Sequence, residues 1–269
     1  MSNNLFGRIV KVDVDTGTYK GSFTNDNFTI TFSIPFDDDP MPNESIVSIY
    51  NLSTSTRNSL RKGSDITINA GYKSDGYGVL LSGKIGKVET TRSGVDDITT
   101  IHITEGVDYS NVNVKKTITF KARTTAQQIL YRLVSELGTS FAFFSLPNNK
   151  VYSSGYTVED TIIDKMEEVA KDCGASIYWR RGKLICRSIK SGDDERFTLE
   201  EDTGLLDSPE YWEDDTGKGW NIRSLLQYRI STASIIQLKS RAVNGTFRVK
   251  SGTHSFDGSS FITEAVVVY

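Results

Sequence analysis

Apolar and polar residues alternate through most of the chain up to residue 108. In the segment DITINAGY (65–72), Ile66, Ile68, Ala70 and Tyr72 share one face, and this period of two predicts a half-buried strand. Similar patterns predict strands in FGRIVKVDV, FTITFSI, SIVSIYNLS, GVLLSGKIGKVET and TTIHITEG. The one interruption, STSTRNSLRKGS, predicts a single helical turn or a tight corner. So many strands without a long helix favour a barrel or a sandwich.

The periodicity then changes to that of helices. Thr124-Thr125-Ala126-Gln127 fits a capping box, and the helix behind it is expected to stop at Gly138. A second helix is expected to begin near Thr157 and to stop at Gly174. Strands in ASIYWR and KLICRS then form a hairpin that turns at Arg181-Gly182. The inward stripes of the two helices are Ala126, Ile129, Leu130, Leu133, Val134 and Leu137 in the first, and Ile162, Met166, Val169 and Cys173 in the second.

Strand patterns return at the end of the chain, after a strongly acidic stretch. The run SGDDERFTLEEDTGLLDSPEYWEDDTGKG is expected to be loop-like, with its charges on a solvated face. Beyond it, strands are predicted in WNIRSLLQYRI, ASIIQLKS, GTFRVKSGTHS and FITEAVVVY. Asn244-Gly245 is the clearest hairpin signal of the chain.

These patterns predict a mainly β protein with an α/β insert. Residues 1–108 are expected to form a tube-like β-barrel or sandwich, and residues 109–190 a small two-helix α/β domain. Residues 191–269 are expected to form a second tube-like β-barrel or sandwich.

The last segment resembles the first in the order of its features. An apolar strand (47–53 or 223–231) leads to a polar corner, then to a hairpin, then to a glycine in the returning strand. This order predicts one barrel design used twice, in which Ile66 and Ile68 fall near Ile235 and Leu238.

Composition and charge narrow the class of protein. A formal net charge of −3 over 269 residues gives no basic field of the kind that nucleic-acid-binding proteins carry. Cys173 and Cys186 are too few for a disulfide framework, so both are predicted to be buried thiols in a reduced compartment. The N-terminus lacks a signal-peptide core, and no apolar run approaches the ~20 residues of a membrane span.

The stretch GVLLSGKI (78–85) fits most of the pattern of a phosphate-binding loop. That loop needs a strand before it, a helix after it, and a Ser or Thr behind the lysine. Here Ile85 follows Lys84, and the residues between Gly78 and Gly83 resemble a strand. The turn pair Asp75-Gly76 precedes it, so the stretch is predicted to be the second arm of a β-hairpin.

The two histidines give little support for catalysis. His102 lies at an alternating position of a predicted strand, where a partly buried structural histidine is the simpler interpretation. Ser251, His254 and Asp257 could be assembled into a triad, but they crowd one turn and no G-x-S-x-G elbow occurs. No catalytic residue and no enzymatic activity is therefore predicted.

No metal or cofactor site is predicted either. Asp37, Asp38 and Asp39 could bind calcium, but the Pro-Met-Pro that follows breaks an EF-hand loop, so a solvated turn is favoured. No Cys/His spacing matches zinc. The run from Tyr178 to Arg181 could stack nucleobases, but it belongs to one short hairpin without basic surroundings.

Three motifs in order resemble the baseplate or tail hub proteins of tailed bacteriophages and prophages. The run SIVSIYNLSTSTRNSLRKGSDITINAGYKSDGYGVLLSGKIGKVE is similar to the first barrel of that family. The segment from TTAQQILYRLVSEL to ASIYWRRGKLICRS is similar to its α/β insert, and RSLLQYRISTASIIQLKSRAVNGTFRVKSGTHSFDG looks like its second barrel. Two loops depart from the pattern: Gln227-Tyr228 replaces an expected Asn-Pro, and HSFDG (254–258) replaces a tighter His-x-Gly-Asp.

The resemblance implies a structural role in the virion, at the tail baseplate, after synthesis in the host cytoplasm. It implies a homotrimeric ring whose six barrels face the six-fold tail tube and whose other face holds a three-fold spike or fibre. DNA would only pass through the channel during ejection, and acidic residues are expected to outnumber basic ones on its wall. The implied partners are the chain itself, the tail tube or distal tail protein, and the central spike or fibre protein, with the tape measure protein as a further candidate and no membrane insertion.

Some hub chains continue into lytic domains, whereas this sequence stops at Tyr269, so lytic activity is expected from another chain. Two alternatives stay open. A β-rich receptor- or carbohydrate-binding tail protein would place exposed aromatic residues on loops, for which Tyr211-Trp212 and Trp220 are the candidates. An enzyme of undetected type would show activity on peptidoglycan or polysaccharide.

Overall fold

The computed structural model describes residues 5–106, 117–193, 195–214 and 217–269. Within these residues the chain is mainly β with a small α/β insert, which confirms the predicted fold class. None of the helices in the described ranges has the length and apolar character of a membrane span. The predicted domain boundaries stay a prediction, and the one between the first module and the insert falls among residues outside these ranges.

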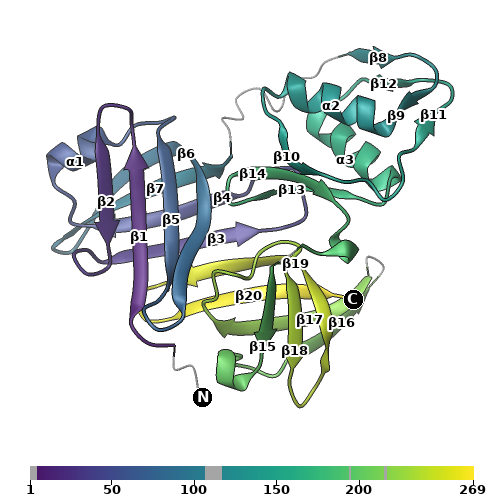
Figure 1. Cartoon of the computed structure of the whole chain (residues 1–269). Helices are drawn as coiled ribbons and strands as arrows, with labels where there is room; N and C mark the ends of the chain where they lie inside the picture. Colours follow the sequence, from purple (N-terminus) through teal and green to yellow (C-terminus); the bar gives the residue numbers. More distant parts are fainter. Residues whose placement is uncertain (1–4, 107–116, 194, 215–216) are drawn as a thin grey trace.

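The first module consists of seven strands and one short helix, arranged in two layers (Figure 1). The layer of β1, β2 and β5 lies in front of the layer of β3, β4 and β7, and the long strand β6 takes part in both. Alternate residues of each layer point between them and form the core, as the period of two predicts. The elements are β1 (Arg8–Asp15), β2 (Lys20–Thr24), β3 (Ile30–Phe36), β4 (Glu44–Tyr50), α1 (Thr54–Ser59), β5 (Asp65–Tyr72), β6 (Gly76–Ser93) and β7 (Asp96–Glu105).

The insert packs two helices against a three-stranded sheet, with two short strand pairs at its margin. Both predicted helical stripes are buried apart from Leu137, which caps the first helix and is half-buried. The elements are β8 (Ile118–Phe120), β9 (Thr124–Thr125), α2 (Ala126–Glu136), β10 (Phe141–Phe144), β11 (Val151–Tyr152), β12 (Tyr156–Val158), α3 (Ile162–Asp172), β13 (Ser176–Arg180) and β14 (Lys183–Arg187).

The second module again has two layers of strands around an apolar core. Its elements are two 3₁₀ turns, η1 (Ile189–Ser191) and η2 (Glu201–Thr203), and the strands β15 (Arg196–Leu199), β16 (Glu210–Asp214), β17 (Gly217–Leu225), β18 (Ile235–Lys239), β19 (Asn244–Phe256) and β20 (Phe261–Val268).

The two modules are joined into one sheet. The C-terminal part of β19 pairs antiparallel with β3, from Gly252 opposite Phe36 to Phe256 opposite Phe32. The strand order is therefore continuous, β16-β17-β20-β19-β3-β4-β7-β6-β5-β1-β2. Phe256 and Phe261 also reach the core of the first module, where the ring of Phe261 lies 5.3 Å from that of Tyr72.

The predicted internal repeat has a counterpart in the strand order. The first module has the order β3-β4-β7-β6-β5-β1, and the second has β16-β17-β20-β19-β18-β15. The pairing directions agree as well, except that β1 runs antiparallel to β5 whereas β15 runs parallel to β18. Both returning strands carry an irregularity at the same point, after Ile85 in β6 and after Val249 in β19.

The strand register shows which residues of the two modules correspond to each other. Ile66 lies opposite Gly83, two residues before Ile85, and Ile236 lies opposite Phe247, two residues before Val249. Ile66 therefore corresponds to Ile236 rather than to the predicted Ile235. By the same register, Ile68 corresponds to Leu238, as the sequence predicts.

Four local predictions are wrong by a few residues or in kind. Thr125, not Thr124, caps the first helix, with Gln128 completing the capping box. The second helix begins after Thr161, because Thr157 belongs to β12. The turn between β18 and β19 is the segment 240–243, and Asn244 already pairs with Lys239.

The fourth correction concerns the acidic stretch. It contains the strands β15 and β16, and Asp193 is only 7% exposed, so the stretch is not simply a solvated loop. An ion pair with Arg180 compensates the buried charge of Asp193.

Candidate assembly surface

The continuous sheet has one side that points away from both cores, here called the outer face. It runs across β17, β20, β19, β3, β4, β7 and the C-terminal half of β6. The opposite side of these strands is buried against β1, β5, β15 and β18. Because both modules contribute strands, the outer face is a single surface shared by the two halves of the chain.

Small hydroxyl side chains dominate the centre of the outer face. Ser255 lies opposite Ser33 across the junction of the modules, and Ser48 Oγ lies 3.1 Å from Thr100 Oγ1. The side chains in this central region are Thr31, Ser33, Ser48, Thr100, Thr253 and Ser255, with Ile46 37% exposed among them. Such a surface has hydrogen-bonding capacity but few long side chains, which suits contact with polar partners or water.

Charged residues flank this hydroxyl region. His102 lies between two carboxylates, with Nδ1 2.5 Å from Glu44 and Nε2 3.1 Å from Glu89. At the other end, Arg223 lies 3.3 Å from Glu264. The side chain of His102 is 22% exposed and fully occupied by these contacts, in keeping with the predicted structural role.

The tip of the β13–β14 hairpin fixes the insert to both modules. Arg181 donates to the backbone carbonyl of Tyr228 at 2.6 Å, and Arg180 forms ion pairs with Asp193 and Glu195. Toward the first module, the indole N–H of Trp179 donates to the carbonyl of Pro40 at 3.1 Å. The run from Tyr178 to Arg181 therefore packs between the insert and the two modules. The rings of Tyr178 and Trp179 are buried and are not available to stack nucleobases.

Glu105 is the most unusual titratable group of this junction. Its side chain is 4% exposed, and its Oε1 accepts a hydrogen bond from the backbone N–H of Gly182 at 2.9 Å. Burial raises the pKa of Glu105 to about 7, against the lowering effect of that hydrogen bond and of Arg181. Sequence patterns do not predict this contact, because Glu105 and Gly182 are far apart in the chain.

A second contact joins the modules directly. The segment 227–229, which contains the Gln227-Tyr228 pair found in place of the expected Asn-Pro, packs on the turn between β5 and β6. Asp75 accepts hydrogen bonds from Arg229 at 2.7 Å and from Gln227 at 3.1 Å. The ring of Tyr228 lies so close to Gly78 that a Cβ built there would be 2.4 Å from it.

This packing explains the phosphate-loop match. Gly78 leaves room for Tyr228, Gly83 lies against the backbone of Thr104, and Lys84 pairs with Asp65 at 2.6 Å. The whole stretch belongs to β6, as the sequence predicts. The glycines of this stretch therefore allow close packing and do not form a phosphate-binding loop.

The structure does not bring Ser251, His254 and Asp257 together as a catalytic group. His254 is 2% exposed, its Nδ1 lies 2.8 Å from the hydroxyl of Thr263, and burial lowers its pKa to about 3. Asp257 instead accepts hydrogen bonds from the backbone N–H groups of Ser259 and Ser260. His254 is therefore a neutral core residue with a satisfied ring.

The candidate calcium ligands form a turn after β3. Asp37 accepts from the N–H of Asp39 at 3.1 Å, and Asp39 accepts from the N–H of Met41 at 2.7 Å. Burial raises the pKa of Asp37 and Asp38. Across the part of the chain that the structure describes, no cluster of His, Cys, Asp and Glu has the makings of a metal site.

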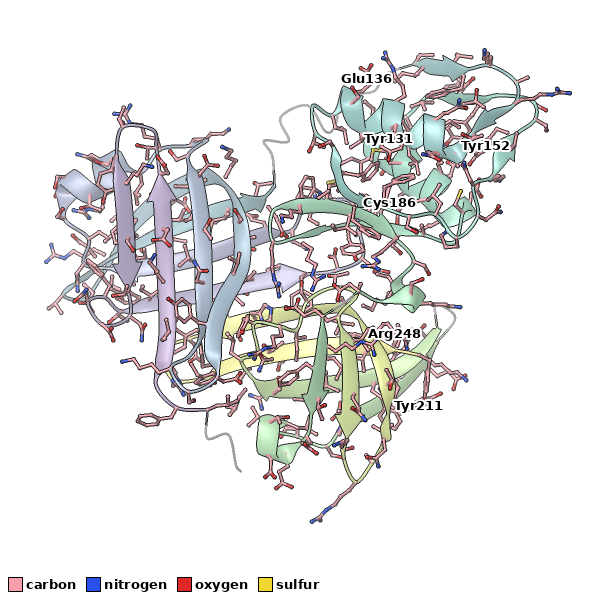
Figure 2. All side chains as sticks on the ribbon, viewed as in Figure 1. Tyr131, Glu136, Tyr152, Cys186, Tyr211 and Arg248 are labelled. Carbon is pink, nitrogen blue, oxygen red and sulfur yellow. The ribbon has the colours of Figure 1, made fainter. Side chains whose placement is uncertain are left out.

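The remaining sequence candidates fall elsewhere. Tyr211 is 49% exposed and its ring lies 5.3 Å from that of Trp220, but both residues are on strands rather than on loops. Figure 2 shows Tyr211 at the margin of the second module and Cys186 on the insert. Cys173 and Cys186 are free and buried, as predicted.

Comparison with known proteins gives one family. The family model for Baseplate hub gp41 matches residues 9–258, nearly the whole chain. No curated protein sequence matches.

Several solved structures share the fold at low sequence identity. The tail protein from Neisseria meningitidis MC58 aligns with a TM-score of 0.69 and 11% identity over 97% of this chain and 96% of its own. The 43 kDa tail protein of prophage MuSo2 from Shewanella oneidensis aligns with a TM-score of 0.68 and 9% identity over 97% and 98%. The E. coli c3393 protein, a component of the type VI secretion system, aligns with a TM-score of 0.66 and 10% identity over 90% and 73%.

Proposed function

Because the chain belongs to the baseplate hub gp41 family, whose members are structural proteins of phage tails, we propose that three copies close into a ring at the end of the tail tube. Each copy contributes two similar modules, so three copies present six similar units to the six-fold tube. The other side of the ring then holds a three-fold spike or fibre. The hub thereby adapts one symmetry to the other and leaves a channel for DNA.

The repeated module is the observation that supports this proposal. The two modules have the same strand order, the same strand irregularity and one continuous sheet. A repeat whose two halves differ in sequence lets a three-fold ring offer six nearly equivalent sites. The insert is proposed to lie outside the ring, where it does not obstruct closure.

The outer face is the proposed wall of the channel. Closing the sheet around an axis leaves only the outer face free to line that axis, because the other side is buried in the cores. The acidic residues on it are Glu44, Glu89 and Glu264, joined at its margin by Glu210 and Asp214 of β16, and the basic ones are Lys87, Arg223 and Arg248 beside His102. An acidic, hydroxyl-rich wall does not bind the phosphates of a passing duplex.

The test is to determine the mass and symmetry of the purified protein. Native mass spectrometry should give a mass of three chains at high protein concentration. Averaged electron micrographs should then show a ring with three-fold symmetry and six similar lobes around a channel. A protein that stays monomeric at every soluble concentration, or particles without a central channel, would overturn the proposal.

A further inference from the structure

Besides the edges of β2 and β15, two strand edges beside the outer face stay unpaired within the described residues. One is β16, which pairs with β17 on one side only. The other is the C-terminal half of β6, since β5 pairs with β6 only as far as Lys84 opposite Asp65. These edges lie at opposite ends of the run β16-β17-β20-β19-β3-β4-β7-β6. An open edge readily accepts a strand from another chain.

The internal repeat shows which strands fit together. In the order of the repeat, β16 corresponds to β3, and β6 corresponds to β19. Within the chain, β3 pairs with the part of β19 that follows Val249, beyond the reach of β18. The matching part of β6, beyond Ile85, has β7 on one side and no described strand on the other.

We propose that β16 of one copy pairs antiparallel with residues 87–91 of β6 in the next copy, repeating between chains the contact that β3 and β19 make within one chain. This inference rests on the proposed ring and names the strands that close it. The occupant of each edge is thus a second copy of this chain. Three such contacts, alternating with the three internal ones, join the sheets around the channel into a single closed barrel, in which β16 and the C-terminal half of β6 no longer have a free edge.

The register of the contact follows from the equivalences. Within the chain, Ser255 lies opposite Ser33 and Gly252 opposite Phe36. Ser255 corresponds to Thr91, since they lie opposite Ile262 and Ile98 at matching points of the two hairpins. Ser33 corresponds to Glu210, because each lies opposite the matching residue of the next strand, Ile46 or Asn221.

Glu210 is therefore expected opposite Thr91, and Asp214 opposite Lys87 of the next copy. The second pair brings opposite charges together, which favours this register over its neighbours. Tyr211 would face Thr90, on the side of the sheet that is buried. The contact would then cover an aromatic side chain that is 49% exposed in the single chain.

The two contacts differ in one respect. The contact within the chain is stabilised by Phe256 and Phe261, which pack into the core of the first module. Arg92 and Asp97 stand at the corresponding positions of the β6–β7 hairpin, and Asp97 pairs with Arg57 at 3.1 Å. The contact between chains therefore relies on backbone pairing and charge, so it is expected to be more sensitive to salt than the internal one.

Disulfide cross-linking tests the register directly. Directly opposite residues of antiparallel strands have Cβ atoms about 4.5–5.5 Å apart, close to the spacing that a disulfide accepts. Glu210 and Thr91 are both exposed, and the two native cysteines are buried. The E210C/T91C variant should give a covalent trimer on a non-reducing gel after mild oxidation. E210C/T90C is the matched control, because neighbouring strand residues point to opposite faces.

The outcomes separate this contact from the ring itself. Suppose that native mass spectrometry shows a trimer while E210C/T91C gives no cross-link, or while the control E210C/T90C is cross-linked equally well. Either result overturns the strand contact and leaves the ring intact. A cross-linked ladder that continues beyond three chains supports the contact and overturns the closed trimer. A protein without any oligomer, cross-linked or not, overturns both.

Discussion

Gly63 and Ala233 occupy the same position in the two modules. Each has a left-handed backbone, with φ of 84° at Gly63 and 66° at Ala233. Each also donates its N–H to the strand residue before the irregularity, Gly63 to the carbonyl of Ile85 at 2.7 Å and Ala233 to that of Val249 at 2.8 Å. The two polar corners predicted from the sequence therefore share the same backbone conformation and the same hydrogen bond.

Gly63→Ala should lower the free energy of unfolding by about 1 kcal/mol, since the left-handed conformation costs a residue with a Cβ roughly that much. No atom lies within 4 Å of the added methyl group, so steric overlap does not contribute. Urea denaturation followed by circular dichroism measures the difference.

Gly86 supplies the control. It is the extra residue of the β6 irregularity, its nearest neighbours would lie 3.6 Å from a Cβ, and Lys250 fills the same place in β19. Gly86→Ala should therefore change stability by no more than about 0.5 kcal/mol. A loss as large as that of Gly63→Ala would show that backbone conformation is not the cause.

Gly78→Ala should destabilise the protein by about 1–3 kcal/mol, the usual cost of overpacking a filled contact. The added Cβ would lie 2.4 Å from the ring of Tyr228, and Gly78 itself has no left-handed backbone. In the Tyr228→Ala background the same substitution should cost much less, because the ring is gone. Equal costs in the two backgrounds, measured in a double-mutant cycle, would contradict the packing of the segment 227–229 on the β5–β6 turn.

The sequence predicts the strands with one buried face, because burial leaves a period of two. It misses β16, whose EYWED residues are largely exposed on both faces, so no alternation appears there. It also misses the junction at Glu105, Arg181 and Asp75. Their contacts depend on segments far apart in the chain, and a single sequence does not record which distant segments meet.

Glu105 should make stability fall as the pH rises from about 4.5 to about 7. Its pKa is raised in the folded protein to about 7, so in this window the folded state binds more protons than the unfolded state. A shift of this size corresponds to a loss of about 3 kcal/mol, complete above pH 7. Urea denaturation of wild type and E105Q between pH 5 and pH 8 measures the difference.

E105Q keeps an oxygen acceptor for the N–H of Gly182 but cannot ionise. Its stability relative to wild type should therefore increase with pH across the window. The depressed pKa of His254, about 3, acts in the opposite direction between about pH 3 and pH 6.5, since the unfolded state then binds the extra proton. His254 is present in both proteins, so its contribution cancels. A constant difference between the two proteins would refute the raised pKa of Glu105.

Cys173 and Cys186 should not react with a thiol reagent in the native protein. Both are buried, and burial raises the pKa of Cys186 to about 12, which suppresses the reactive thiolate. Titration with Ellman's reagent should find two thiols only after unfolding. Rapid reaction of the native protein, or fewer than two thiols after unfolding under non-reducing conditions, would contradict the packing of the insert.

Reversing the charge of the outer face should make the protein bind DNA. Duplex DNA carries one negative charge per ~1.7 Å of axis, so lysines on a channel wall would release counterions and hold it. E44K/E89K/E264K places three lysines on the outer face, and E159K/E201K/D202K makes the same change in net charge at exposed residues elsewhere. Fluorescence anisotropy at several salt concentrations should show salt-dependent binding of duplex DNA to the first variant, weaker binding to the second, and none to wild type. Equal affinities of the two variants would mean that net charge alone causes DNA binding. That result would contradict the proposal that the outer face lines the channel.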